Sequence, residues 1–185
     1  MVVKVHSLRE YFRDSLHSAL EHQQVSVGGE TEQYVVNLLT LFAHSDALFE
    51  QTADGARIRP LVVMLADALE AHSARERCAG LQRLGDVSLF VAGFFAQGFA
   101  RKLIDIDYHI AMGGRAYGTL SEAVRRSGRA ALGPVFGELA AKFQQMVDAL
   151  NEVSEAGYQY SDRDILRLYE VWLKTGSRRA ERLLS

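Results

Sequence analysis

Between Asp86 and the basic pair Arg101-Lys102, the sequence contains fourteen consecutive uncharged residues, from Val87 to Ala100 (VSLFVAGFFAQGFA). A membrane-spanning helix needs roughly 20 apolar residues, so this run is too short to cross a bilayer and has the length of a helix buried in a protein core. A helix that is apolar on all sides must be surrounded by other elements. We therefore expect an all-α protein, a single-domain helical bundle built around this central helix.

The composition is that of an ordinary globular protein and argues against several other classes. The 185 residues are 48% hydrophobic and 24% charged, which disfavours disorder. The net charge of −2 offers no basic surface for nucleic acid. Cys78 is the single cysteine and has no intramolecular disulfide partner, and the first twelve residues lack the apolar core of a signal peptide. We expect a cytoplasmic protein without a transmembrane segment.

Apolar residues at spacings of three and four predict about seven helices and no strand. The stretch from Thr52 to Gly55 is expected to be a polar loop, because it lacks the alternation of a strand. One helix each is expected to begin at Ser7, after Gly28-Gly29, at Pro60, at Ser73, near Arg101, at the pattern that begins with Leu132, and at Ser161. Capping boxes mark three of these starts: Ser7 with Glu10, Ser73 with Glu76, and Ser161 with Asp164.

Two helices carry long heptad-like seams and are expected to pack as an antiparallel hairpin across the short turn at 127–131. The seam of the fifth helix, roughly 101–126, is Leu103, Ile106, Ile110, Gly113, Tyr117, Leu120 and Val124. The seam of the sixth is Leu132, Phe136, Leu139, Phe143, Met146, Leu150 and Val153. The third helix is expected to turn inward Leu61, Leu65, Ala68 and Leu69. Gly113-Gly114 is interpreted as a notch for close helix packing. The alternative is that Gly113, Ala116 and Gly118 leave room for a flat ligand against the helix.

The polar residues in and after the fourth helix form the best candidate ligand-binding site. It comprises Asp86, Asp105, Tyr108, His109 and Tyr117. Asp105 and His109 are four residues apart and share a helix face, so the carboxylate is in a position to orient the imidazole for metal binding or acid–base work. The alternatives are an Arg101–Asp105–His109 ladder on the surface, or a buried polar contact that fixes how the two helices register.

No motif for catalysis or for a resident metal is found. Ferritin-like metal sites need Glu-x-x-His, which is missing, and the six histidines include no His-x-x-x-His pair. No G-x-S-x-G elbow and no phosphate-binding glycine loop occurs. Cys78 has no histidine near it in sequence and is expected to be a structural thiol. The sequence therefore predicts no catalytic residue and no metal ligand.

The segment LGDVSLFVAGFF, followed by RKLIDIDYHIAMGGRAYG, resembles a family of bacterial all-helical proteins without an assigned activity. That resemblance implies a stand-alone bacterial helical domain and no specific chemistry. The stretch LGDVS at 84–88 also resembles the start of the distal helix of haem oxygenases. This second resemblance implies a haem cofactor, with His17 or His22 as the iron ligand. The chain departs from that pattern where Leu89-Phe90 replaces the expected glycine pair.

These observations lead to two expectations about function. The first is a non-catalytic protein that acts, in a regulatory or scaffolding role, by binding a protein partner or itself as a homodimer, with no cofactor. The alternative is a small-molecule or haem-binding protein whose pocket lies beside the fourth and fifth helices. Both apply to a single domain over residues 1–185, in which 177–185 form a short basic tail.

Overall fold

The computed structural model describes residues 5–44, 46–94, 106–128 and 131–157. The chain divides into two compact units, Met1–Ser154 and Glu155–Ser185. Most of the second unit lies outside the described residues, as do the predicted helix that begins at Ser161 and the predicted basic tail. The expectation of one domain over the whole chain therefore stays a prediction, and the description below concerns the first unit.

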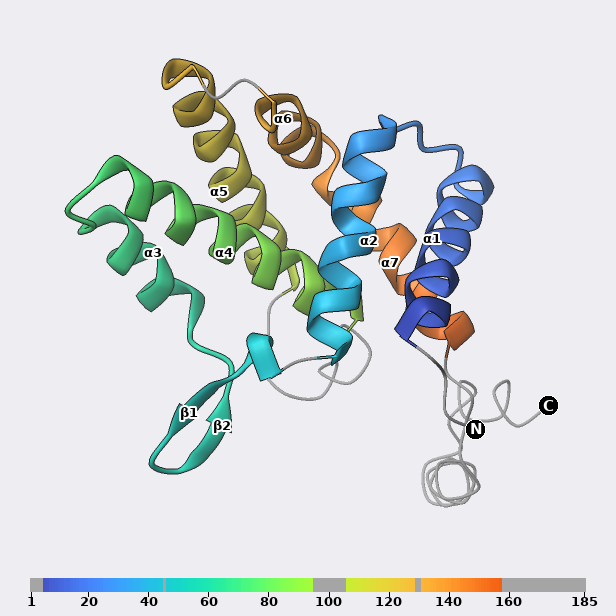
Figure 1. Cartoon of the computed structure of the whole chain (residues 1–185), viewed down its shortest axis with the longest axis horizontal. Helices are drawn as coiled ribbons and strands as arrows, with labels where there is room; N and C mark the ends of the chain where they lie inside the picture. The colour runs from blue at the N-terminus through green and yellow to red at the C-terminus, as the bar shows by residue number, and fades with distance from the viewer. Residues whose placement is uncertain (1–4, 45, 95–105, 129–130, 158–185) are drawn as a thin grey trace. The chain divides into compact units, whose positions relative to one another are not determined.

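The described residues form seven helices and one small hairpin, which confirms the all-α fold class (Figure 1). In chain order the elements are α1 (Val5–His22), α2 (Gly29–His44), a 3₁₀ turn η1 (Asp46–Leu48), β1 (Glu50–Thr52), β2 (Gly55–Arg57), α3 (Leu61–Leu69), α4 (Ala74–Phe94), α5 (Ile106–Arg126), α6 (Gly133–Ala141) and α7 (Phe143–Gly157).

Helix α4 is the central helix that the uncharged run predicts. Every residue from Val87 to Gly93 is buried. The ring of Phe90 packs against Phe42 of α2 at 5.1 Å between centroids, and Phe94 packs against Phe12 of α1 at 6.2 Å. Helices α3 and α5 also pack along α4, and α7 reaches it at Gly93. The second part of the uncharged run, residues 95–100, lies outside the described residues.

The start of α4 confirms the second predicted capping box. The backbone N–H of Glu76 donates to Ser73 Oγ at 3.1 Å, and Glu76 Oε2 accepts from the backbone N–H of His72 at 3.2 Å. The glutamate thus reaches one residue further back than in the usual box, where it would meet the N–H of Ser73. Two N–H groups at the start of α4 are satisfied in this way.

The predicted polar loop at Thr52–Gly55 is instead the tip of a β-hairpin. Thr52 pairs with Gly55 and Glu50 with Arg57, so two residues form the turn. Gly55 has φ +110°, a conformation that favours glycine, and Thr52 Oγ1 donates to the Gly55 carbonyl at 2.6 Å. The expectation of no strand was wrong here, because each strand has three exposed residues and shows no apolar alternation.

The predicted sixth helix is two helices, because Lys142 interrupts the helical backbone between α6 and α7. The backbone of Lys142 leaves the helical region at φ −116° and ψ 26°, while its N–H still bonds the Glu138 carbonyl at 2.9 Å. Its ammonium group donates to the Ser26 carbonyl and to Glu138 Oε2. The heptad spacing does not reveal the break, because the apolar residues on both sides still face the core.

Two residues of the predicted inner faces lie outside instead. Leu132 is 47% exposed because it caps the start of α6 and does not follow the helical face. Leu69 is 58% exposed at the end of α3. The antiparallel packing of α5 and α6 is confirmed, since Ser121 Oγ donates to the Gly133 carbonyl at 2.9 Å while Gly118 lies near Ala140.

Glycines allow α4, α5 and α7 to approach one another closely. A Cβ on Gly113 would overlap Phe143 Cζ of α7 and lie 2.7 Å from Ser88 Cβ of α4. A Cβ on Gly85 of α4 would lie 2.5 Å from Cε1 of Tyr117 in α5. The interpretation of Gly113-Gly114 as a packing notch is therefore confirmed at Gly113, where an aromatic ring fills the space, and is wrong at Gly114, where the nearest atoms lie 3.9 Å from a Cβ position.

We predict opposite effects for two adjacent glycine substitutions in α5. Gly113→Ala should lower the free energy of unfolding by about 1–3 kcal/mol, because the added methyl group overpacks a filled contact. Gly114→Ala should raise it by about 0.5–1 kcal/mol, since the nearest atoms lie 3.9 Å away and alanine is the better helix former. Urea unfolding of both variants measures the difference. Equal effects would contradict the packing described.

Candidate functional site

The strongest polar cluster lies where α2, α4 and α5 meet, around the carboxyl group of Asp86. Asp86 Oδ1 accepts the phenol O–H of Tyr34 at 2.7 Å and that of Tyr117 at 2.6 Å. Gln82 Nε2 donates to the Tyr34 hydroxyl oxygen at 3.0 Å. We call Tyr34, Gln82, Asp86 and Tyr117 the Asp86 cluster. It joins three helices through a single carboxylate oxygen.

Helix geometry and aromatic packing position these side chains. Gln82 and Asp86 are four residues apart and therefore share the face of α4 that meets Tyr34. The Tyr117 ring stacks on Phe136 of α6 at 5.8 Å, and Tyr34 meets the same Phe136 edge-on at 5.4 Å. One ring of α6 thus supports both phenols. Gly85, next to Asp86, leaves the space that the Tyr117 ring occupies.

Burial dominates the electrostatics of the cluster. It raises the pKa of Asp86 to about 6, although the hydrogen bonds from Tyr117 and Tyr34 and the charge of Arg83 act in the opposite direction. Burial, together with the charge of Asp86, raises the pKa of both Tyr34 and Tyr117. The phenols therefore remain protonated donors at neutral pH. The residue Asp86 as a whole is half-buried, whereas its carboxyl group lies deep.

Arg83 links the cluster to the segment after α2. Its guanidinium lies over the Phe42 ring, 5.4 Å from the centroid, and donates to the Ala47 carbonyl. Its charge also acts on Asp86, one helical turn away. The side chain therefore fastens η1 to α4 and partly offsets the buried carboxylate.

A carboxyl group that titrates near pH 6 is suited to proton transfer, provided that a substrate comes within hydrogen-bond reach. Asp86 Oδ1 is instead shared by two phenols, and neither of the two pockets described below includes Asp86 among its lining residues. The observed geometry supports a structural role, in which one acceptor fixes the register of three helices.

Of the five residues in the predicted site, the structure brings Asp86 and Tyr117 together. His109 is buried and Tyr108 is 40% exposed, and their rings meet edge-on at 5.9 Å. Eight residues separate His109 from Tyr117, which is about 12 Å along α5. Tyr108 and His109 therefore lie apart from the Asp86 cluster, and Asp105 lies outside the described residues. Sequence reasoning missed Tyr34 and Gln82, although the spacing of Gln82 and Asp86 was a usable signal.

A pocket of about 290 Å³ lies between the hairpin, α3 and α4. Its apolar wall is formed by Leu48, Ile58, Met64, Ala68 and Val87, and its charged residues are Glu50, Arg59, Asp67, Glu76 and Arg83. Arg59 pairs with Glu50 at 3.3 Å and also with Asp67. One guanidinium thus engages two of the three carboxylates within the chain itself.

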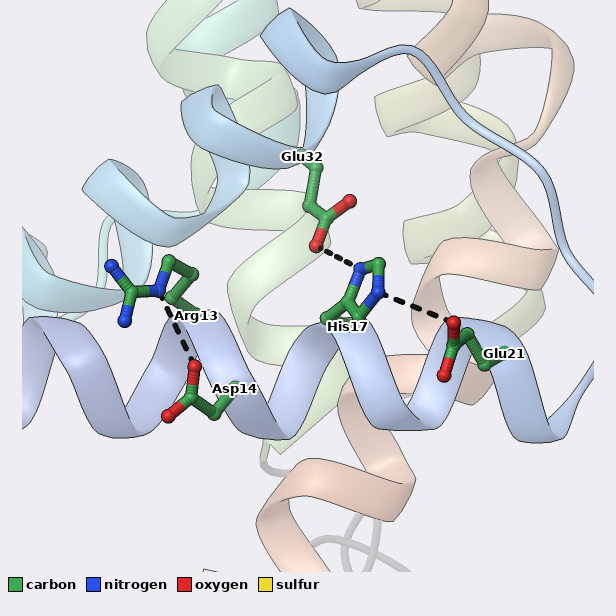
Figure 2. A network of polar contacts seen from close by, with 5 residues as sticks. All are labelled: Arg13, Asp14, His17, Glu21 and Glu32. Carbon is green, nitrogen blue, oxygen red and sulfur yellow. Dashed lines mark hydrogen bonds and ion pairs between the residues drawn. The ribbon is translucent and has the colours of Figure 1, made fainter.

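A second, open pocket of about 400 Å³ lies between the end of α1 and the start of α2. His17 Nδ1 lies 3.0 Å from Glu32 Oε1, and His17 Nε2 lies 3.3 Å from Glu21 Oε1, as Figure 2 shows. Both ring nitrogens thus face carboxylates. His22 Nδ1 lies 2.9 Å from Glu152 Oε1. The alternative that His17 or His22 binds haem iron stays a prediction.

Comparison of the chain with family models, curated proteins and solved structures finds no match. The resemblances to a bacterial all-helical family and to haem oxygenases therefore stay predictions. Among the described residues, no helix has both the length and the apolar character to cross a membrane. Within the same residues, no group of three or more His, Cys, Asp or Glu side chains is placed to hold a metal ion.

We predict that the stability of the Asp86→Asn variant relative to wild type increases as the pH rises. A raised pKa means that the charged form is disfavoured in the folded state, so the stability that protonated Asp86 contributes is complete below about pH 3.8 and is lost as the pH rises through about 6. Asparagine keeps an oxygen for both phenols without a charge. Its free energy of unfolding relative to wild type should rise by about 1–3 kcal/mol between pH 4 and pH 7, measured by urea unfolding.

Asp86→Ala and Asp54→Asn provide the controls for this comparison. The alanine variant leaves two buried phenols without their acceptor and should lose about 2–4 kcal/mol at neutral pH. Asp54 lies exposed at the hairpin tip, and its asparagine variant reports the effect of removing a surface charge. If the difference between Asp86→Asn and wild type does not change with pH, the carboxyl group is not buried as described.

Proposed function

We propose that the protein is a non-catalytic binding module, with a regulatory or scaffolding role, that associates with a protein partner or a second copy through α3. The observation that carries this proposal is the amount of apolar surface on α3 itself that is exposed to solvent. Leu61, Met64 and Ala68 are buried, whereas Val62 and Leu69 on the same short helix are 59% and 58% exposed.

Helical geometry places these exposed residues on one face. Successive residues are about 100° apart around a helix, so Val62, Ala66 and Leu69 share a face that adjoins the buried one. All three are exposed, and Val63 is 38% exposed. The apolar arc of α3 is therefore wider than its contact with α4. We call Val62, Val63, Ala66 and Leu69 the α3 surface.

Exposed apolar side chains are concentrated on α3. Of the eight large hydrophobic residues that are exposed among the described residues, three lie on this nine-residue helix: Val62, Val63 and Leu69. Apolar surface that is grouped on one element is typical of protein-binding sites, whereas isolated exposed residues are common everywhere. The adjacent hairpin is fully exposed along both strands.

The heptad-like seams do not supply an interface. Gly113, Tyr117 and Leu120 of α5 are buried against the same chain, as are Phe136 of α6 and Phe143 of α7. These seam residues are therefore used within the chain and do not carry the proposal of self-association. The proposal of self-association now rests on α3.

Charged substitutions on α3 test the proposal. Val62→Glu and Leu69→Lys place an acid in the first turn of α3 and a base in its last turn, which the helix dipole favours, so the fold should be retained. Each substitution removes an apolar contact worth about 1.5–3 kcal/mol when fully buried. We expect the double variant to weaken association more than tenfold, as measured by sedimentation between 1 and 100 µM or by titration of a captured partner.

Leu132→Glu is the matched control, because Leu132 is similarly exposed but belongs to the start of α6. It should leave association unchanged. A wild-type chain that is monomeric at every concentration would remove self-association. If, in addition, the double variant bound partner proteins with the same affinity as the wild type, the α3 surface would not be the binding site.

A further inference from the structure

Two histidine–glutamate pairs connect α1 to its neighbours. His17 pairs with Glu32 of α2 at 3.0 Å (Figure 2), and His22 pairs with Glu152 of α7 at 2.9 Å. Within the described residues, these are the ion pairs that join α1 to another helix. The one other pair of α1 with a permanent cation, Arg13 with Asp14, stays within the helix.

The surroundings of both histidines are acidic. His17 faces Glu21 from its own helix and Glu32 from α2, while the neighbouring loop residues that line the same pocket are uncharged. His22 faces Glu152 from α7, and Gln23 donates to the second oxygen of that carboxylate at 2.7 Å. The Arg13–Asp14 pair is the next charged group along α1 in Figure 2. No second cation competes with either histidine among these groups.

We propose that α1 docks in a pH-dependent manner, held more firmly on α2 when His17 is protonated. Both ring nitrogens then carry a proton, and the imidazolium donates charge-assisted bonds to Glu32 of α2 and to Glu21 of its own helix. When His17 loses its proton, one ring nitrogen can no longer donate and the attraction between opposite charges is lost, so the link to α2 weakens. The device regulates how firmly one helix covers the core and requires no ligand.

The electrostatics agree in sign with this geometry. The hydrogen bond and the charge of Glu32, followed by the charge of Glu21, raise the pKa of His17. The stability that such a group contributes is complete below the ordinary histidine pKa of about 6.5 and is lost as the pH rises through the raised value. On the other side, hydrogen bonds from Gln23 and His22 lower the pKa of Glu152.

The loop after α1 has a different kind of anchor. Lys142 donates to the Ser26 carbonyl, and Glu138 Oε1 accepts the backbone N–H of Gly28 at 2.8 Å. Neither bond involves His17, so the loop between α1 and α2 stays attached while the hold on α1 varies. Gln24, with φ +57°, lies at the junction between the two.

Loosening of α1 would affect the core directly. Leu16, Ala19 and Leu20 are at most 3% exposed, and Phe12 contacts Phe94 of the central helix. These apolar contacts keep α1 bound at every pH, so the His17–Glu32 pair changes how often the helix opens and does not decide whether it folds. The expected response is thus a graded change in local opening.

Hydrogen exchange of the full chain between pH 6 and pH 8 tests the proposal. Protection is corrected for the intrinsic exchange rate and is expressed for α1 relative to α5. In the wild type this ratio should fall about two- to fivefold as the pH rises, which is the range expected for one exposed ion pair. In His17→Gln the ratio should already be low at pH 6 and should not change further.

Two further variants complete the test. His72→Gln replaces an exposed histidine that makes no ion pair within the described residues, and it should behave as the wild type does. Glu32→Gln removes the same link from the opposite side and should match His17→Gln. A wild-type ratio that is constant from pH 6 to pH 8 would overturn the proposal. A full pH response in either of these two variants would do the same.

Discussion

The burial of the second half of α4, where every residue from Val87 to Gly93 is buried, is the constraint from which the rest of the structure follows. Because helices contact this segment from every direction, its neighbours must come close and its polar groups must find partners inside the protein. Gly85 and Gly93 meet the first requirement, and the Asp86 cluster meets the second. Ser88 is the exception, since its Oγ is buried without a hydrogen-bond partner among the described residues. The Asp86 cluster is thus a consequence of the burial of α4.

Much of the fold was predictable because helical periodicity records which side chains are inside. The uncharged run placed α4, and the Ser73–Glu76 pair placed its start. Periodicity does not predict burial at helix ends or in short polar strands. Leu69 lies at a helix end with more apolar surface than its neighbours cover, and the hairpin is too short and too polar to show a period of two. The break at Lys142 preserves the spacing of apolar residues, so no pattern in the sequence reveals it.

The candidate site was only partly predictable, for a related reason. Spacing within a helix shows which residues share a face, but it says nothing about partners from distant segments. Asp86 and Tyr117 were named because both stand out as polar groups in apolar surroundings. Tyr34 looks like an ordinary core aromatic in the sequence, and its partnership with Asp86 arises from the packing of α2 on α4. Tyr108 and His109 were grouped with them because they are near in sequence, whereas in space they lie two turns away.

The break at Lys142 allows one apolar series to serve two sets of neighbours. Before it, α6 lies along α5 and α2; after it, α7 reaches α4 through Gly93 and α1 through His22 and Gln23. A single continuous helix in place of α6 and α7 would keep the direction of α6. It would leave the side of α4 that α7 covers exposed to solvent. The change in helix direction at Lys142 therefore closes the bundle. The side chain of the same residue also binds the loop between α1 and α2.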